Sequence, residues 1–234
     1  MDLARIITHA AQQAGVVIGA QDVVVVAQKI VSKAEGRAMD LGGVEAGPQA
    51  LEMAALTGRP PALAQLILDE SIEVMRATPM AIITRHRTGH VTANSGIDAS
   101  NVEGGDEGTV LLWPRDPDAC ARAIRSGLPG RPAVVIADSL GRAWRQGTLG
   151  TAIGVAGLIH TDDRRGQADM FGRTLQATIV AVADAIAAFA VLAMGEGAEG
   201  TPVAVVRGAG RWVTEADGTG ATAIMRPAAG DLFP

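Results

Sequence analysis

Three carboxylates stand beside glycines or hydroxyls at the ends of predicted elements, and their chemistry suits a metal site. Asp98 lies in the polar stretch 90–102, where a strand runs into a loop, Asp138 ends a buried strand and precedes Ser139, and Glu196 follows a long helix. Hard oxygen ligands of this kind suit Mg²⁺ or Mn²⁺. Taken singly, each carboxylate has a simpler explanation: an Asx-turn for the first, the N-cap of a following turn for the second, and a solvated loop charge for the third.

The lysines are concentrated in one short stretch. Of the twenty basic residues only Lys29 and Lys33 are lysine, and both lie within residues 28–33. A compact ammonium binds phosphate as a point charge, which a planar guanidinium does not reproduce. With the carboxylates, the pair predicts a pocket in which divalent ions bridge acidic side chains to a nucleoside triphosphate, with a lysine near the γ-phosphate. The alternative is chance, or two solvated charges at a strand end.

Familiar motifs of other enzyme classes are absent from the sequence. It contains no G-x-x-x-x-G-K-[ST] phosphate loop, no G-x-G-x-x-G after a strand and no G-x-S-x-G nucleophile elbow. The four histidines form no recognisable metal motif, and His86 and His90 are expected to be ordinary surface or hairpin residues. Cys120 is the single cysteine, which excludes an internal disulfide and a cysteine-cluster zinc site.

Composition narrows the range of partners. The 234 residues are 48% hydrophobic and 19% charged, which is enough apolar material for a substantial core. A net charge of −5, no Tyr and only three Phe and three Trp argue against nucleic-acid binding. No apolar run reaches the roughly 18 residues that a membrane span needs. We therefore expect a cytoplasmic protein with neither a nucleic-acid nor a membrane partner.

Hydrophobic periodicity and turn residues place these groups on elements. Asp2 is a plausible N-cap for the first helix. Helices are predicted over 3–15, 48–58, 61–76, 117–126 and 169–194; strands over 22–31, 110–113, 132–137, 152–159 and 203–206; a hairpin over 81–85 and 91–93; a turn over 32–37; and a charged loop over 161–166. Strands that interleave with helices and a hairpin predict an α/β or α+β layered fold rather than a regular parallel sheet. Of the two, we expect α+β, with mixed or antiparallel sheets packed with helices.

Several stretches together resemble the coenzyme F420:L-glutamate ligases (F420-0:γ-glutamyl ligases), in particular the ligase domain of actinobacterial members. They run in the family's order over nearly the whole chain, and the combination is far more specific than any one piece. The matching stretches are Val-Ser-Lys-Ala-Glu-Gly-Arg (31–37), Ile-Thr-Arg-His (83–86), Ala-Asn-Ser-Gly-Ile-Asp-Ala-Ser-Asn-Val (93–102), Ala-Asp-Ser-Leu-Gly-Arg-Ala-Trp-Arg (137–145), Ala-Ile-Gly-Val-Ala-Gly (152–157), Ala-Asp (183–184), Met-Gly-Glu (194–196) and Pro-Val-Ala-Val-Val-Arg-Gly (202–208).

The resemblance implies a GTP-dependent ligase of γ-glutamyl ligase-type fold without a P-loop. A carboxylate of the deazaflavin coenzyme precursor would be activated as an acyl phosphate, and the amine of L-glutamate would then form an amide, with γ-linked glutamates added later. Two divalent ions, Mg²⁺ or Mn²⁺, are implied, with K⁺ as an additional candidate. A homodimer is also implied. Residues 1–234 would form a single ligase domain that lacks the family's N-terminal strand.

The resemblance also assigns roles to individual residues. Asp98 and Asp138 would bind one metal, and Ser139 and Glu196 the second. Lys33, Asp98 and Asp138 would be the catalytic residues. The expected contacts with GTP are Gln28, Lys29, Lys33, Asn101, Met194, Gly195, Glu196, Gly197, Ala198, Glu199, Gly200 and Thr201.

Two other functions remain open at this point. The first is a catalytically weak homologue that binds nucleotide or a deazaflavin and serves as a partner subunit. The second is a metal-dependent phosphohydrolase, whose GTP hydrolysis would not depend on glutamate. Both use the same carboxylates and lysines, so the sequence does not separate them from a ligase.

Overall fold

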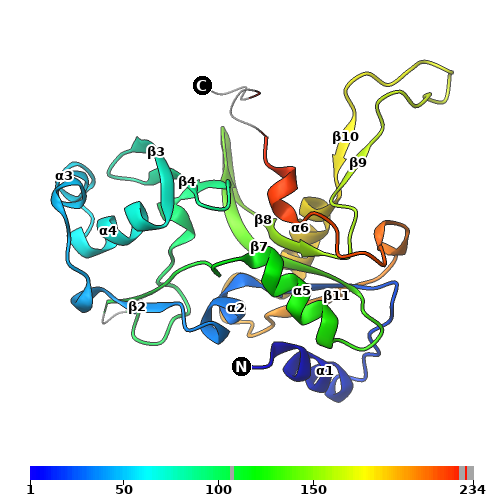
Figure 1. Ribbon diagram of the computed structural model, residues 1–234, viewed down its shortest axis with the longest axis horizontal. Coiled ribbons are helices and arrows are strands. Elements are labelled where there is room, and N and C mark those ends of the chain that lie inside the picture. Colours follow the sequence, from blue (N-terminus) through cyan, green and yellow to red (C-terminus); the bar gives the residue numbers. More distant parts are fainter. Residues whose placement is uncertain (106–107, 227–229, 231–234) are drawn as a thin grey trace. The chain divides into compact units, whose positions relative to one another are not determined.

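A computed structural model describes residues 1–105, 108–226 and 230 of the chain (Figure 1). The contacts divide the chain into two compact units. Unit 1 contains Gln28–Asp116 and Leu140–Leu149, together with Met1, and unit 2 contains Asp2–Ala27, Pro117–Ser139 and the described chain from Gly150 onward. The predicted α+β class is confirmed, because helices pack with several small mixed or antiparallel sheets.

A four-stranded sheet of order β11-β1-β7-β8 lies mainly in unit 2, and the end of β7 and the start of β8 belong to unit 1. Strand β1 (Val23–Ala27) pairs parallel to β7 (Ala133–Arg142) and antiparallel to β11 (Val203–Val206), so the sheet is mixed. The fourth strand is β8 (Arg145–Ala156). The first four residues of β1 are all valine and fully buried, as expected for a central strand with both faces covered.

Helix α6 (Val182–Met194) contacts β1 and β11 and supplies much of the core of unit 2. The helix approaches β8 closely at Gly150, where a Cβ would lie 2.6 Å from the carbonyl oxygen of Ala187. The helices α1 (Leu3–Gln13) and α5 (Pro117–Gly127) also contact one another. The predicted cap is confirmed, since the side chain of Asp2 accepts a hydrogen bond from the backbone N–H of Arg5.

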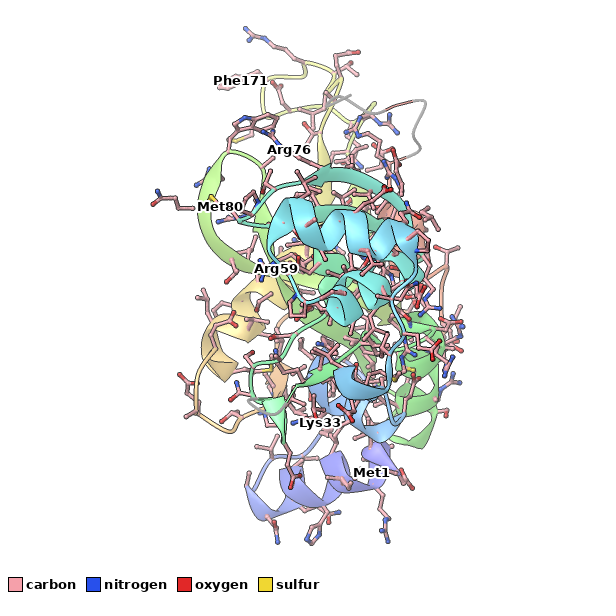
Figure 2. All side chains as sticks on the ribbon, turned by 90° about the vertical axis from the view of Figure 1, so that its left-hand side faces the viewer. Met1, Lys33, Arg59, Arg76, Met80 and Phe171 are labelled. Carbon is pink, nitrogen blue, oxygen red and sulfur yellow. The ribbon has the colours of Figure 1, made fainter. Side chains whose placement is uncertain are left out.

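The predicted helix over 169–194 is wrong in its first half, because α6 begins only at Val182. The preceding residues form an arm in which β9 (Thr161–Asp163) pairs antiparallel to β10 (Ile179–Ala181), so the charged loop expected over 161–166 also begins as a strand. Figure 1 shows the arm projecting beyond α6, and Phe171 lies at its tip (Figure 2). Two local features oppose a helix here: the left-handed Gly172, and the side chain of Asp169, which accepts hydrogen bonds from two nearby backbone N–H groups.

Unit 1 is built from short helices and small sheets. Helices α3 (Pro48–Thr57) and α4 (Pro61–Asp69) pack side by side next to β3 (Ser71–Ala77), as Figure 1 shows. The other elements are α2 (Gln28–Ala34), the antiparallel pair β2 (Ala38–Asp40) and β6 (Thr109–Leu111), the strands β4 (Ile82–His86) and β5 (Val91–Ala93), and the 3₁₀ turns η1 (Leu41–Gly43) and η2 (Asn94–Gly96). The predicted hairpin is confirmed as β4 and β5.

Several boundaries differ from the sequence prediction, and the strand expected over 152–159 is β8, which begins earlier, at Arg145, and ends at Ala156. The strand expected over 22–31 ends at Ala27, and α2 takes the place of its last residues and of most of the expected turn. The helix expected over 61–76 ends at Asp69, because the following residues pair with β4 as β3. The strand expected over 132–137 continues to Arg142. In the last two cases the strand pairs with the next strand along the chain, β3 with β4 and β7 with β8, and this pairing overrides the local pattern.

His86 and His90 are hairpin residues as predicted, but they are not on the surface. They are 0% and 3% exposed, and their rings lie 4.9 Å and 5.5 Å from that of the buried Trp113. The burial of these two rings cannot be predicted from the short polar sequence between the two strands, because it depends on tertiary contact with the indole. Separately, no helix in the described part of the chain is long and apolar enough to cross a membrane.

A buried ion cluster around Glu70 fixes the end of α4. The Glu70 side chain is 8% exposed and binds Arg37, Arg87 and His86, and Nη2 of Arg37 lies 2.9 Å from both carboxylate oxygens. Burial raises the pKa of this carboxyl, but hydrogen bonds from His86, Arg87 and Arg37 outweigh burial and lower the pKa to about 2. The ionised form therefore stabilises the folded state.

The Glu70→Gln variant should be less stable at neutral pH by about 3 kcal/mol, because it leaves the buried Arg37 charge without its partner. The folded pKa of about 2 lies below the ordinary 4.5, so the contribution is complete above pH 4.5 and is lost as the pH falls toward 2. Urea unfolding at pH 7 and pH 3 should therefore show a smaller difference between variant and parent at pH 3.

The matched control is Glu73→Gln, because Glu73 pairs with Arg85 but its side chain is 57% exposed. It should change the free energy of unfolding by less than about 1 kcal/mol at either pH. A Glu70→Gln effect that is equally large at both pH values would contradict the assigned ion cluster.

Candidate functional site

Helix α2 places the two lysines on one face. Lys29 and Lys33 are four residues apart in Gln28–Ala34, and residues at this spacing are neighbours on a helix surface. Figure 2 shows Lys33 on this short helix. The strand end and turn expected from the sequence would have separated the two side chains, whereas the helix directs both ammonium groups to the loop that follows η2.

Asp98 forms an ion pair with Lys29. Its Oδ2 lies 2.5 Å from Nζ of Lys29, across 69 positions of sequence, and also accepts a hydrogen bond of 2.9 Å from Oγ of Ser100. Its Oδ1 accepts the backbone N–H of Ser100 at 2.7 Å, which is the Asx-turn expected as the simpler explanation. The Asx-turn therefore forms, and the same carboxylate also binds a positive charge.

The electrostatics of Asp98 favour its charged form. Burial raises the pKa of the carboxyl, but the hydrogen bonds from Lys29 and Ser100 and the charge of Lys29 outweigh burial, so the pKa lies below its ordinary value. A carboxylate that remains ionised and already attracts a cation has the donor chemistry that a hard divalent ion needs.

The second lysine binds the end of the same loop. Nζ of Lys33 donates to the backbone carbonyl of Asn101 at 2.8 Å. Asn101 has a φ of 54°, in the left-handed region that asparagine tolerates better than most residues. Two residues predicted to contact phosphate, Lys29 and Lys33, thus bind the loop that carries one predicted metal ligand, Asp98, within unit 1.

Gln28, the first residue of α2, is also a predicted nucleotide contact. Its side chain is buried, and Oε1 accepts a hydrogen bond of 2.7 Å from Oγ of Ser32. Its amide nitrogen has no hydrogen-bond partner among the described residues. The amide can therefore still donate, although its burial means that a ligand would have to approach closely.

Unit 2 brings together the two residues predicted for the second metal. Oγ of Ser139, in β7, donates to Oε1 of Glu196 at 2.5 Å, across 57 positions of sequence. Asp138 precedes Ser139 inside the strand, so the N-cap explanation for it is wrong. Glu196 is exposed after α6, where the unpaired carbonyls at a helix C-terminus favour positive charge.

The loop after α6 is ordered by its own acidic side chain. Oε2 of Glu199 accepts the backbone N–H of Gly197 at 2.7 Å, and a Cβ on Gly195 would lie 2.3 Å from the carboxyl carbon of Glu199. Gly195 and Gly200 both have φ values in the left-handed region. Apart from the buried Met194, the predicted nucleotide loop is largely exposed, and its backbone is folded tightly enough to require glycine.

The predicted ligands are divided between the units: Asp98 belongs to unit 1, while Asp138, Ser139 and Glu196 belong to unit 2. Within the described residues, no group of three or more His, Cys, Asp or Glu side chains is arranged to hold a metal ion. A cavity of about 580 Å³ lies between α1 and the end of α5, and none of the predicted site residues lines it.

The structure thus joins Ser139 with Glu196, the two residues predicted for the second metal. It also pairs Lys29 with Asp98 and Lys33 with Asn101, which the sequence had assigned to one site without pairing them. The sequence analysis did not assign a site role to Ser100, which makes two hydrogen bonds to Asp98. The Asp-x-Ser spacing is the signal that could have found it, because a residue two positions after Asp donates to it in an Asx-turn.

Comparisons with known proteins match most of the chain. The profile of the family described as F420-0:Gamma-glutamyl ligase matches residues 1–208. The Coenzyme F420:L-glutamate ligase of Methanothermobacter thermautotrophicus is 42% identical, over 99% of this chain and 92% of that protein. The proteins of the same name from Archaeoglobus fulgidus and Haloarcula marismortui are 45% and 46% identical, each over 80% of this chain and 75% of theirs. The chain therefore belongs to the F420-0:gamma-glutamyl ligase family.

Proposed function

We propose that this chain is a GTP-dependent ligase that joins L-glutamate to the deazaflavin precursor of coenzyme F420 and then adds γ-linked glutamates. Family membership and the names of relatives at 42% to 46% identity support the reaction class. The observation that carries the proposal is the pairing of predicted residues that are far apart in sequence, above all Lys29 with Asp98 and Ser139 with Glu196.

The chemistry proceeds in two balanced steps. A carboxylate oxygen of the precursor attacks the γ-phosphorus of GTP, the bond to the bridging oxygen breaks, and GDP leaves with that electron pair. The amine of L-glutamate then attacks the acyl carbon, the phosphate leaves, and the nitrogen loses a proton as the amide forms. Phosphoryl transfer of this kind depends mainly on positioning and charge stabilisation.

The side chains of unit 1 suit the phosphate end of this reaction. The ammonium groups of Lys29 and Lys33 neutralise phosphoryl charge, and the backbone around Asn101 fixes the loop beside them. The amide of Gln28 is a further donor in the same unit. Lys33 is the residue that we assign to the transferring phosphoryl group.

The oxygen donors fit Mg²⁺ or Mn²⁺, with K⁺ as an additional candidate, because carboxylate and hydroxyl oxygens are hard ligands. Asp98, Asp138, Ser139 and Glu196 would each supply a ligand. When bound, two such ions would neutralise the triphosphate and stabilise the charge that develops during transfer. The proposal also includes a homodimer and a cytoplasmic location.

The direct test is an assay of GDP release from purified protein supplied with Mg²⁺ or Mn²⁺, L-glutamate and the deazaflavin precursor. A ligase releases GDP only when both acceptor and amine are present. GTP hydrolysis that does not depend on glutamate would indicate a phosphohydrolase instead. Binding of nucleotide or deazaflavin without turnover would indicate a catalytically weak partner subunit.

Asp98→Asn and Asp138→Asn should each lower kcat by more than about 100-fold, because loss of an outer partner of a metal ligand alone costs 10–100-fold. Both variants should keep the circular dichroism spectrum of the parent. Asp69→Asn and Asp163→Asn are matched controls in units 1 and 2, since within the described residues these carboxylates contact Gln65 and Arg165, respectively, and activity should not change. Near-parental activity in either site variant would remove that residue from the metal ligands.

Lys33→Arg should also lose most GDP release, because a planar guanidinium cannot replace a compact ammonium at a phosphoryl group. A steady-state assay at saturating metal would measure the loss as a lower kcat. Arg76→Lys is the matched control, since it exchanges the same two side chains at an exposed position of β3. Full activity in Lys33→Arg would show that charge alone is sufficient there.

A further inference from the structure

The backbone immediately before Asp98 follows an unusual path. Three consecutive residues of η2 lie in the left-handed region: Asn94 with a φ of 51°, Ser95 with 52° and Gly96 with 70°. Glycine adopts such angles freely, but serine and asparagine do so at a cost. Strain of this kind persists only where the surroundings determine the conformation, and it concentrates at functional sites.

The first restraint on this turn is a chain of buried hydroxyls. Ser95 is 0% exposed, its N–H donates to Oγ1 of Thr84 at 3.1 Å, and its Oγ lies 2.9 Å from that oxygen and 2.6 Å from Oγ of Ser71. Ser71 in turn donates to the carbonyl of Ile67.

In one arrangement of the protons, each of the three hydroxyl groups donates one hydrogen bond. Thr84 donates to Ser95, Ser95 donates to Ser71, and Ser71 donates to the carbonyl of Ile67 in the last turn of α4. The turn is thereby connected both to the hairpin strand β4 and to α4. The hydroxyl at position 95 can accept from one neighbour and donate to the other, which the methyl group of alanine could not do.

The second restraint is the close contact of the turn with the side chain of Trp113. A Cβ at Gly96 would lie 2.3 Å from Cε2 and Nε1 of Trp113, so the backbone is in direct contact with the indole. Trp113 is itself fully buried against the rings of His86 and His90. The chain at this point cannot shift toward the indole.

The turn delivers the backbone to Asp98 in a fixed orientation. Two residues after Gly96, the N–H of Asp98 donates to the carbonyl of Leu111 at 3.1 Å, and the N–H of Leu111 donates back at 2.7 Å. The direction of the Asp98 carboxylate thus depends on the path of the preceding turn and on this bridge to β6.

We propose that Ser95 is a positioning residue for the Asp98 carboxylate: its hydroxyl relay holds the left-handed turn against Trp113 and thereby aims Asp98 at a bound cation. This inference rests on the proposed function of Asp98 as a metal ligand. Ser95 does not touch the cation or the reacting atoms. Residues that orient ligands in this way typically change metal affinity about 10–100-fold when they are replaced.

The test measures Mn²⁺ binding by electron paramagnetic resonance, and the KM for Mn²⁺ in the GDP-release assay, for four variants of the full chain. Ser95→Ala removes the hydroxyl, and Ser95→Gly removes it while also relieving the left-handed strain. Asp98→Asn identifies the Mn²⁺ site that depends on this carboxylate. Thr57→Ala removes another buried hydroxyl of unit 1, which donates to the carbonyl of Met53 at 2.7 Å.

Both Ser95 variants should weaken the Asp98-dependent Mn²⁺ site about tenfold or more and raise the KM for Mn²⁺ more than they lower kcat at saturating metal. Thr57→Ala should lower the melting temperature without changing Mn²⁺ affinity. Affinities within twofold of the parent in Ser95→Ala, or recovered in Ser95→Gly, would overturn the positioning role while leaving the ligase proposal intact. A parent protein without an Asp98-dependent Mn²⁺ site would overturn both.

Discussion

The ion pair between Lys29 and Asp98 is the interaction on which the candidate site in unit 1 depends. Its two atoms are 2.5 Å apart, although their residues are separated by 69 positions. The pair exists because β1 ends at Ala27 and the chain turns at once into a helix, which places Lys33 on the same face and within reach of Asn101. A single helical turn therefore brings two ammonium groups to one loop.

Buried contacts elsewhere in unit 1 restrain the chain that leads into that loop. Trp113 contacts the rings of His86 and His90 and also the backbone of Gly96. Glu70 neutralises the buried Arg37, whose Nε also donates to the carbonyl of Trp113 at 2.8 Å. The charged groups Arg37 and Glu70 are paired with each other in a low-dielectric interior, where an unpaired charge would be costly. Rigidity behind a loop is what allows a carboxylate on it to keep one direction.

In unit 2, regular secondary structure holds the candidate site residues in place. The mixed sheet and α6 form an almost purely aliphatic core, and small residues such as Gly150 and Ala187 let the helix approach the sheet. Ser139 on β7 and Glu196 after α6 are held by this packing at hydrogen-bonding distance. Their contact is a consequence of helix-on-sheet packing, so a substitution deep in that core should affect the site as well as stability.

The sequence alone determined the α+β class, most element positions, and the residue types of the site. The all-valine run of β1, the capped helix α1 and the Gly-centred hairpin are specified by local chemistry, which needs no distant partner. Tertiary structure decided the rest. Residues 71–77 became a strand because β4 offers hydrogen bonds, Phe171 came to lie on an arm instead of a helix, and His86 became buried because Trp113 covers it. The common reason is that pairing and burial depend on neighbours brought together by folding, and local periodicity does not contain them.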